Sequence, residues 1–304
     1  MRKFKKTKRT LIILVSIYVL LIIVSYFPYK TIPVKRHAEK DSLFIKVKGH
    51  NVHYKKFGKG RPLVLVHGFA GSTYTWRYLA PLLSKKYTVY AYDVLGFGLT
   101  DKPVPGKYDM KSHGEFLIAF MDALKISKAT MIGHSMGGVI VGYAALTDPG
   151  RIDKLVMIEP GFYNKKIPRF LNYMFFPLDR IMSRQFLSRS MRVRFLKGSF
   201  YNKSLVTKEV IDAYMIPNRT PNALESMAYM MSSVGFRFYE GVTDKITSPT
   251  FLIWGDKGKS ALPEVAKRIN GEIKSSKLIM VKGSGHYVQE EKPQKLYKII
   301  LDKI

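Results

Sequence analysis

The sequence predicts an α/β fold with a mostly parallel central sheet, helices on both of its faces, and a helical cap inserted into it. Short apolar runs of strand length alternate with segments of helical length. The apolar run 129–132 passes through a glycine-rich turn into a helical segment over 139–146. Residues 161–243 then break the alternation, because they are rich in aromatic, Met and Arg residues and show no sheet strand. Strands joined through helices lie parallel, with the helices packed on the sheet faces.

Composition sets the outer limits. The chain has 304 residues, enough for one large α/β domain with an insertion. It has no cysteine, which excludes disulfides, thiolate zinc sites and a cysteine nucleophile. Lys and Arg number 51 against 22 Asp and Glu, a formal charge of +29, which favours an anionic surface nearby. Membrane lipid is the expected partner; nucleic acid is not expected, because no reader motif is visible.

The N-terminus predicts an uncleaved membrane anchor. Residues 1–10 form a basic tail without acids, and residues 11–27 carry no charge. A helix over 11–27 would be roughly 25 Å long, the lower limit for crossing a bilayer. A cleaved signal peptide is the alternative, but no small-residue cleavage site follows the apolar run. We therefore expect a single-pass cell-membrane protein, with the N-terminus cytoplasmic, a linker over 28–42, and the folded domain extracytoplasmic.

The folded domain divides into a core over 43–160 and 244–304 and a helical cap over 161–243. Because ligand sites of parallel sheets lie at the carboxyl ends of the strands, residues 67–69, Asp93, Ser135 and Glu159 should gather on one rim. The expected strands are 43–47, 52–57, 62–66, 87–92, 129–132, 154–158, 250–254 and 278–281, and the expected core helices are 73–83, 110–124, 139–146, 262–270 and 293–304.

The stretch Gly133-His134-Ser135-Met136-Gly137 reads G-x-S-x-G between a strand and a helix. This is the setting of a nucleophile elbow, a strained turn that exposes a serine hydroxyl and requires small residues two positions before and after it. A glycine-rich turn that holds a serine by chance is the alternative. The motif needs support from the rest of the chain.

That support comes from a resemblance. Across residues 43–304 the chain resembles the α/β-hydrolase superfamily, in particular its serine esterases and lipases with a helical cap. Four ordered motifs carry the resemblance: His67-Gly-Phe69-Ala-Gly-Ser72 with Trp76, Asp93-x-x-Gly96-x-Gly98, the elbow at Ser135, and Gly283-x-Gly285-His286 with Pro293. It implies that the backbone N–H groups of Phe69 and Met136 form an oxyanion hole.

Ser135 is the candidate nucleophile and His286 the candidate base, because a serine hydroxyl reacts only when a base takes its proton. His286 lies on a glycine-flanked loop after the last strand, late in the order Ser…acid…His. We interpret His67 as a residue that braces its loop and His134 as an elbow side chain. The histidines without a motif are assigned structural roles: His37, His50, His53 and His113.

A serine–histidine pair of this kind needs a carboxylate to orient the histidine, and two residues could supply it. The superfamily commonly shows W-G-x-x-D after the seventh strand, but here Gly258 stands at the acid position. Asp256, two residues earlier, is one replacement. Glu159, at the end of the sixth strand, is the other, and a branch of the haloalkane dehalogenases looks similar there. We favour Glu159 over a solvent-facing strand-end carboxylate, because burial without a partner would be costly and pairing with His286 would fix the imidazole tautomer.

The predicted function is a membrane-anchored serine ester hydrolase acting on an acyl or lipid-like substrate through an acyl-enzyme. Serine at the elbow argues against dehalogenase and epoxide hydrolase chemistry, which in this superfamily uses aspartate there. A ligand-binding pseudoenzyme, an acyltransferase, and an amide or C–C bond hydrolase are the alternatives. We expect no cofactor and no metal. Trp76, Met227 and Met231 are the expected substrate contacts. The basic and aromatic cap either faces anionic lipid or simply covers the site.

Overall fold

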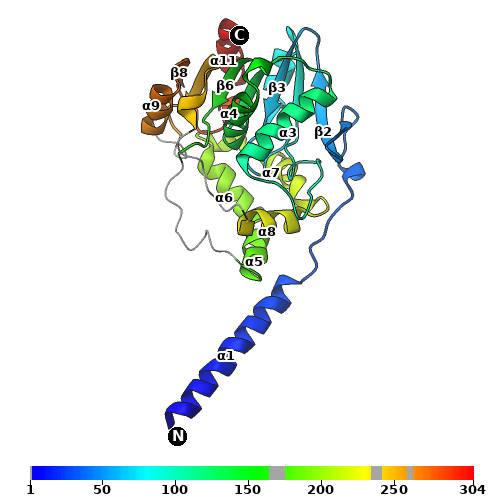
Figure 1. Ribbon diagram of the computed structural model, residues 1–304, viewed down its shortest axis with the longest axis vertical. Helices are drawn as coiled ribbons and strands as arrows, with labels where there is room; N and C mark the ends of the chain where they lie inside the picture. Colours follow the sequence, from blue (N-terminus) through cyan, green and yellow to red (C-terminus); the bar gives the residue numbers. More distant parts are fainter. Residues whose placement is uncertain (1, 164–174, 234–241, 259–262) are drawn as a thin grey trace.

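A single mixed sheet forms the centre of the molecule (Figure 1). The computed structural model describes residues 2–163, 175–233, 242–258 and 263–304, with side chains from residue 9 onward. Within these residues the sheet has eight strands in the order β1-β2-β4-β3-β5-β6-β7-β8. The strands are Leu43–Val47, His50–Phe57, Arg61–Val66, Tyr87–Tyr92, Ala129–His134, Ile152–Ile158, Thr250–Gly255 and Ser276–Val281 for β1 to β8.

Pairing in the sheet follows the prediction of a mostly parallel fold. Strands β1, β2 and β4 pair antiparallel, whereas every pair from β4 across to β8 is parallel. The core helices are α2 (Leu79–Leu83), α3 (Met110–Ala123), α4 (Met136–Thr147), α9 (Pro263–Glu272), α10 (Val288–Glu291) and α11 (Pro293–Lys303). The α/β-hydrolase fold class is therefore confirmed.

Two core clusters lie on opposite faces of the sheet, and strand β3 contributes to both. Val64 and Val66 pack in the cluster with α3, α4 and α9, whereas Leu63 and Leu65 pack in the cluster with α2 and α11. This is the period-2 alternation of a strand that is buried on both faces. It explains why β3 is apolar from Pro62 onward in the sequence.

One predicted helix, over 73–83, is divided in the structure. A short 3-10 helix, η2 (Thr73–Trp76), is followed by α2 (Leu79–Leu83). Ser72 caps η2 by accepting a hydrogen bond from the N–H of Tyr74 at 3.3 Å. Pro81 has no N–H to donate to the carbonyl of Arg77, so a continuous α-helix cannot form across this point.

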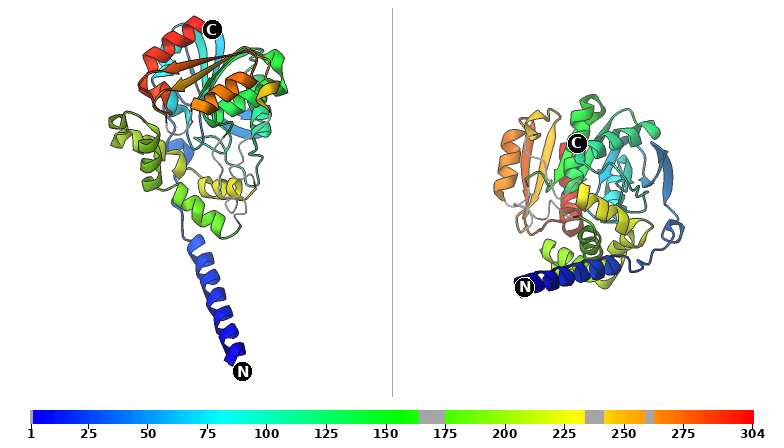
Figure 2. Two further views of the ribbon diagram at one scale, coloured as in Figure 1. Left: turned by 90° about the vertical axis from the view of Figure 1, so that its left-hand side faces the viewer. Right: turned by 60° about the horizontal axis from the view of Figure 1, so that its bottom comes forward.

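The described part of residues 161–243 is helical and lies beyond one end of the strands, between the sheet and helix α1 (Figures 1 and 2). Tyr214 of this segment packs with Tyr287 of the core in one apolar cluster, which joins the two parts. The segment contains α5 (Leu178–Phe186), α6 (Arg189–Ser199), α7 (Lys208–Met215) and α8 (Ala223–Ser233), with short 3-10 turns at Lys203–Leu205, Pro217–Arg219 and Thr243–Lys245.

The predicted membrane anchor over residues 11–27 is wrong. Helix α1 (Arg2–Ser25) projects from the rest of the molecule and ends before Tyr26 and Phe27 (Figures 1 and 2). The uncharged part of the helix, residues 11–25, is about 22 Å long, short of a hydrocarbon core of about 30 Å. Over the part of the chain that the structure describes, no helix is long and apolar enough to cross a membrane. The predicted single-pass, extracytoplasmic location is corrected accordingly.

Candidate active site

The carboxyl ends of the parallel strands meet on the rim that faces the cap. Ser135 directly follows β5, Glu159 follows β6, and His286 lies on the loop after β8. His134 joins the first and last of these, because its Nε2 lies 3.0 Å from the carbonyl oxygen of His286. The topology thus brings together residues that are far apart in the chain.

Ser135 occupies a strained turn, as the sequence predicts. Its φ is 53°, a left-handed conformation that is uncommon for residues other than glycine. A Cβ on Gly133 would lie 2.2 Å from the carbonyl oxygen of Gly137, and a Cβ on Gly137 would lie 2.1 Å from that of Val66. Neither position tolerates a side chain. The tight turn places Ser135, half-buried, at the N-terminus of α4.

His286 is bound to Glu159. The distance from His286 Nδ1 to Glu159 Oε2 is 2.6 Å, and the Glu159 carboxylate is fully buried. The other carboxylate oxygen accepts a hydrogen bond of 2.9 Å from the N–H of Gly255. Glu159 has a φ of 42°, so a second strand-end residue of this rim is strained, as is frequent at functional sites.

Gly258 leaves room for the Glu159 carboxylate beside His286. A Cβ at this position would lie 2.9 Å from Glu159 Oε1 and 3.4 Å from Oε2. The Glu159 carboxylate therefore occupies the space that a side chain at position 258 would need. The missing side chain at Gly258 of Trp254-Gly-Asp-Lys-Gly258 was a sequence signal that the carboxylate beside His286 comes from another strand.

Two of the predicted site residues lie elsewhere. The Asp256 carboxylate is exposed and accepts a hydrogen bond of 2.7 Å from the N–H of Gly283, so it faces the β8 loop rather than the imidazole of His286. Trp76 is fully buried in the cluster that packs α2 and α11 against the sheet, whereas Met136 belongs to the cluster on the opposite face. The alternative acid and one expected substrate contact are thus not brought to His286 and Ser135.

The loop after β3 runs past Ser135. A Cβ on Gly68 would lie 3.1 Å from the Cβ of Ser135, so glycine allows the backbone to pass there. The neighbouring Phe69 ring contacts Phe97, with centroids 5.4 Å apart, and Phe186 of the cap, at 6.4 Å. Met136 is the first residue of α4, where N–H groups point out of the helix. Met136 follows Ser135 directly, and Phe69 lies on the loop that passes it.

The cap is attached directly to the histidine loop. The N–H of His286 donates to the carbonyl of Ser199, the last residue of α6, at 2.9 Å. A Cβ on Gly285 would lie 2.5 Å from that same carbonyl oxygen, which accounts for glycine beside the histidine. Met227 and Met231 are buried on α8 in the cluster that also contains Met136. The sequence motif therefore encodes a contact with the cap as well as a loop.

The histidines beside the elbow are held neutral. Burial, reinforced by the nearby His286, lowers the pKa of His134 well below its usual value. Burial also lowers the pKa of His67, against the opposing effect of Asp93. His67 accepts a hydrogen bond from the N–H of Val94 at 3.0 Å, and its Nδ1 lies 2.7 Å from the Gly68 carbonyl oxygen. These contacts brace the loop, as predicted for His67.

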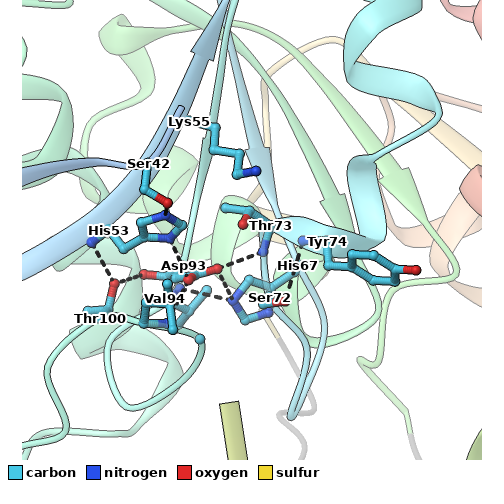
Figure 3. A network of polar contacts seen from close by, with 12 residues as sticks. Ser42, His53, Lys55, His67, Ser72, Thr73, Tyr74, Asp93, Val94 and Thr100 are labelled. Atoms are coloured by element: carbon cyan, nitrogen blue, oxygen red, sulfur yellow. Dashed lines mark hydrogen bonds and ion pairs between the residues drawn. The ribbon is translucent and has the colours of Figure 1, made fainter. Parts of the chain in front are cut away.

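A second histidine–carboxylate pair lies next to this loop and was missed in the sequence (Figure 3). His53 Nδ1 is 2.7 Å from Asp93 Oδ2, and His53 Nε2 is 2.9 Å from the Ser42 hydroxyl. These partners are 40 and 11 residues away along the chain, so no local pattern links them. Within the described residues, no group of three His, Asp or Glu side chains is arranged to hold a metal ion.

Known proteins resemble this chain over most of its length. Residues 61–293 match the family described as alpha/beta hydrolase fold. The chain is 30% identical to an uncharacterised hydrolase, YugF, of Bacillus subtilis (strain 168), over 85% of this chain and 96% of that protein. It is 28% identical to a soluble epoxide hydrolase of Corynebacterium sp. (strain C12), over 82% and 91% of the two chains. A solved meta-cleavage product hydrolase from Pseudomonas fluorescens IP01 superposes with a TM-score of 0.73 at 25% identity, covering 86% of this chain and 96% of that one.

Proposed function

We propose a specific reaction for this chain, which belongs to the alpha/beta hydrolase fold family and is a hydrolase. The proposed reaction is the hydrolysis of carboxylic esters through an acyl-enzyme on Ser135. The observation that supports it most is the 2.6 Å contact between His286 and the buried carboxylate of Glu159, on the same rim as a strained serine. A serine elbow does not supply the aspartate nucleophile of epoxide hydrolase chemistry, although one relative is an epoxide hydrolase.

The proposed steps follow the positions of the groups. With Nδ1 of His286 donating to Glu159, Nε2 carries the lone pair that takes the Ser135 proton as Oγ attacks the ester carbonyl. The N–H groups of Phe69 and Met136 would hold the developing oxyanion. The imidazolium then protonates the leaving alcohol, and His286 later activates a water molecule that releases the acid. Glu159 stabilises the imidazolium without taking its proton.

The proposed substrate has an apolar acyl group. Met227 and Met231 of α8 are buried in the cluster that reaches Met136, and methionine adapts to flexible chains. Phe69 connects the same region to the cap through Phe186. An ester with an acyl or lipid-like chain suits apolar side chains of this kind better than a highly polar substrate does.

A second reaction is worth testing beside the first. A meta-cleavage product hydrolase superposes on this chain at 25% identity, and C–C bond hydrolysis is one of the alternatives that the sequence leaves open. The same Ser–His–acid chemistry serves both reactions, so the fold does not separate them.

The test is a panel of p-nitrophenyl esters of increasing acyl length, with a meta-cleavage product as the C–C substrate. Wild-type protein is expected to hydrolyse the esters, and Ser135→Ala to lose at least about 10⁴-fold in kcat. Ser127→Ala, at a loop serine remote from the rim, serves as the matched control. Turnover of the C–C substrate alone would replace ester hydrolysis by the second reaction. Folded wild-type protein that turned over neither substrate would support a ligand-binding pseudoenzyme.

A further inference from the structure

A second serine–histidine–carboxylate chain lies outside the site described above. Ser42, in the segment before β1, contacts His53 of β2, and His53 contacts Asp93 after β4 (Figure 3). We propose that Ser42 is a second activated hydroxyl, which accepts an acyl group from small esters that enter the adjoining cavity. This site does not depend on Ser135.

The hydrogen bonds define where the protons lie. The N–H of Glu39 donates to the Ser42 hydroxyl oxygen at 3.0 Å, so this oxygen is an acceptor on one side. Its own proton then points to His53 Nε2, 2.9 Å away. His53 carries its proton on Nδ1 and donates it to Asp93 at 2.7 Å. This is the arrangement in which an imidazole takes a proton from a serine hydroxyl.

Asp93 is held as a carboxylate. It accepts hydrogen bonds from the N–H groups of Thr73 at 2.6 Å and Leu99 at 2.7 Å, in addition to His53. Complete burial works to raise its pKa, but the interaction with His53, followed by those with His67 and the N–H of Leu99, outweighs burial and holds the pKa below its ordinary value. The negative charge needed to orient and stabilise the His53 imidazolium is therefore present at neutral pH.

A cavity of about 360 Å³ opens beside this chain of contacts, within the size range of small-molecule sites. Its lining includes Ser42, His53 and Asp93 but not Ser135, Glu159 or His286. Core, cap and N-terminal segment all contribute to its wall, with apolar side chains such as Leu99 and Ile216. The cavity is thus distinct from the site formed by Ser135, Glu159 and His286.

The polar groups of the wall suit a carbonyl oxygen. The Lys55 ammonium lines the cavity and contacts one oxygen each of Glu39 and Asp41, at 2.5 and 2.9 Å. An ammonium has three N–H donors, so one remains for the oxyanion of a bound ester. A small ester with an apolar body would place its carbonyl oxygen near the Lys55 ammonium and its body against the apolar side chains of the wall.

The proposed step is balanced. Ser42 Oγ forms a bond to the ester carbonyl carbon while its proton moves to His53 Nε2. The C–O bond to the alcohol then breaks, the proton passes from His53 to the departing alkoxide, and an acyl-Ser42 ester remains. A fluorophosphonate probe reports the same step, because Oγ–P formation expels fluoride and leaves a stable phosphonyl-serine.

The experiment uses full-length Ser135→Ala protein treated with a fluorophosphonate probe, followed by peptide mapping. A label on Ser42 is expected, and it should disappear in the Ser135→Ala, Ser42→Ala double variant. His53→Gln in the same background should slow labelling at least about 10²-fold. The peptide that carries exposed Ser190 reports the background reaction of an ordinary hydroxyl. Should His53→Gln fail to fold, the Ser42→Ala result still decides.

Labelling of Ser42 no faster than of Ser190 would overturn the proposal and leave the Ser42–His53–Asp93 chain as a brace for the N-terminal segment. The wild-type protein separates this result from the proposed function. Label on Ser135 in the wild type, with none on Ser42 in Ser135→Ala, would refute only the second site. Label on Ser42 alone would refute the first.

Discussion

Two buried histidine–carboxylate pairs in this molecule have nearly the same geometry but different surroundings. His286–Glu159 and His53–Asp93 are joined at 2.6 and 2.7 Å, and both carboxylates are fully buried. Each carboxylate also occupies space left by a glycine: a Cβ on Gly258 would lie 2.9 Å from Glu159, and a Cβ on Gly98 would lie 2.0 Å from Asp93.

The difference lies in the backbone around the carboxylates. Asp93 accepts two backbone N–H groups, from Thr73 and Leu99, which tie the loops after β3 and β4 together. Glu159 accepts one, from Gly255, and is itself held in a left-handed conformation. The comparison teaches that two histidine–carboxylate pairs of nearly equal distance can be held in different ways, one by backbone donors from two loops and the other by a strained backbone.

Replacing Glu159 should break the pair of the proposed catalytic site, and we expect this change to have the largest effect. In Glu159→Gln, an amide N–H₂ facing His286 would favour the tautomer with its proton on Nε2, which cannot take the Ser135 proton. We expect kcat for ester hydrolysis to fall about 10⁴-fold. Asp256→Asn is the matched control, because Asp256 bonds to Gly283, and should change kcat less than about 3-fold. The reverse order of effects would assign the acid to Asp256.

Replacing Asp93 should break the other pair, and we expect the effect to appear in the free energy of unfolding. The carboxylate accepts three N–H groups, so an Asn side chain would place its own N–H₂ against one of them. We expect Asp93→Asn to lower the free energy of unfolding by about 3 kcal/mol or more. Urea denaturation measures this directly. A variant as stable as the wild type would show that Asp93 does not tie these loops together.

Another buried histidine sharpens the comparison, because His113 has no hydrogen-bonded carboxylate among the described residues. Burial lowers its pKa to about 4. Between pH 6.5 and 4 the unfolded chain binds a proton that the folded chain excludes, so this histidine lowers stability as the pH falls. A shift of this size corresponds to about 3 kcal/mol. His113→Leu should reduce the loss of unfolding free energy between pH 7 and pH 4 by up to that amount; an unchanged pH dependence would contradict the assignment.

The smallest expected effect comes from Gly258→Ala. The added Cβ would lie 2.9 Å from Glu159 Oε1, so the carboxylate must shift and its contact with His286 loosens. A loss of about 10-fold in kcat with little change in thermal stability is expected, since such a change corresponds to about 1.4 kcal/mol in the barrier. Gly271→Ala is the control, because a Cβ there meets no atom within 4 Å. Equal kcat in both variants would show that Glu159 tolerates displacement.

The nucleophile turn could be predicted because its requirements are local. Gly133, Ser135 and Gly137 lie within five positions, and the steric limits that demand glycine act over that range. The apolar alternation of the strands was equally readable, and it yielded the fold class. The end of helix α1 could not be predicted in this way, because the apolar pattern continues to Phe27 whereas the helix ends at Ser25.

By itself the sequence determined the sheet-and-helix plan, the strained Ser135 turn and the place of His286 on its glycine loop, since each follows from short-range sterics and periodicity. Only the tertiary structure decided which carboxylate meets His286. That choice depends on the packing of Glu159, Gly255 and Gly258 from two neighbouring strands. The same holds for the chain from Ser42 to Asp93, because no pattern along one strand records which side chains face one another across a sheet.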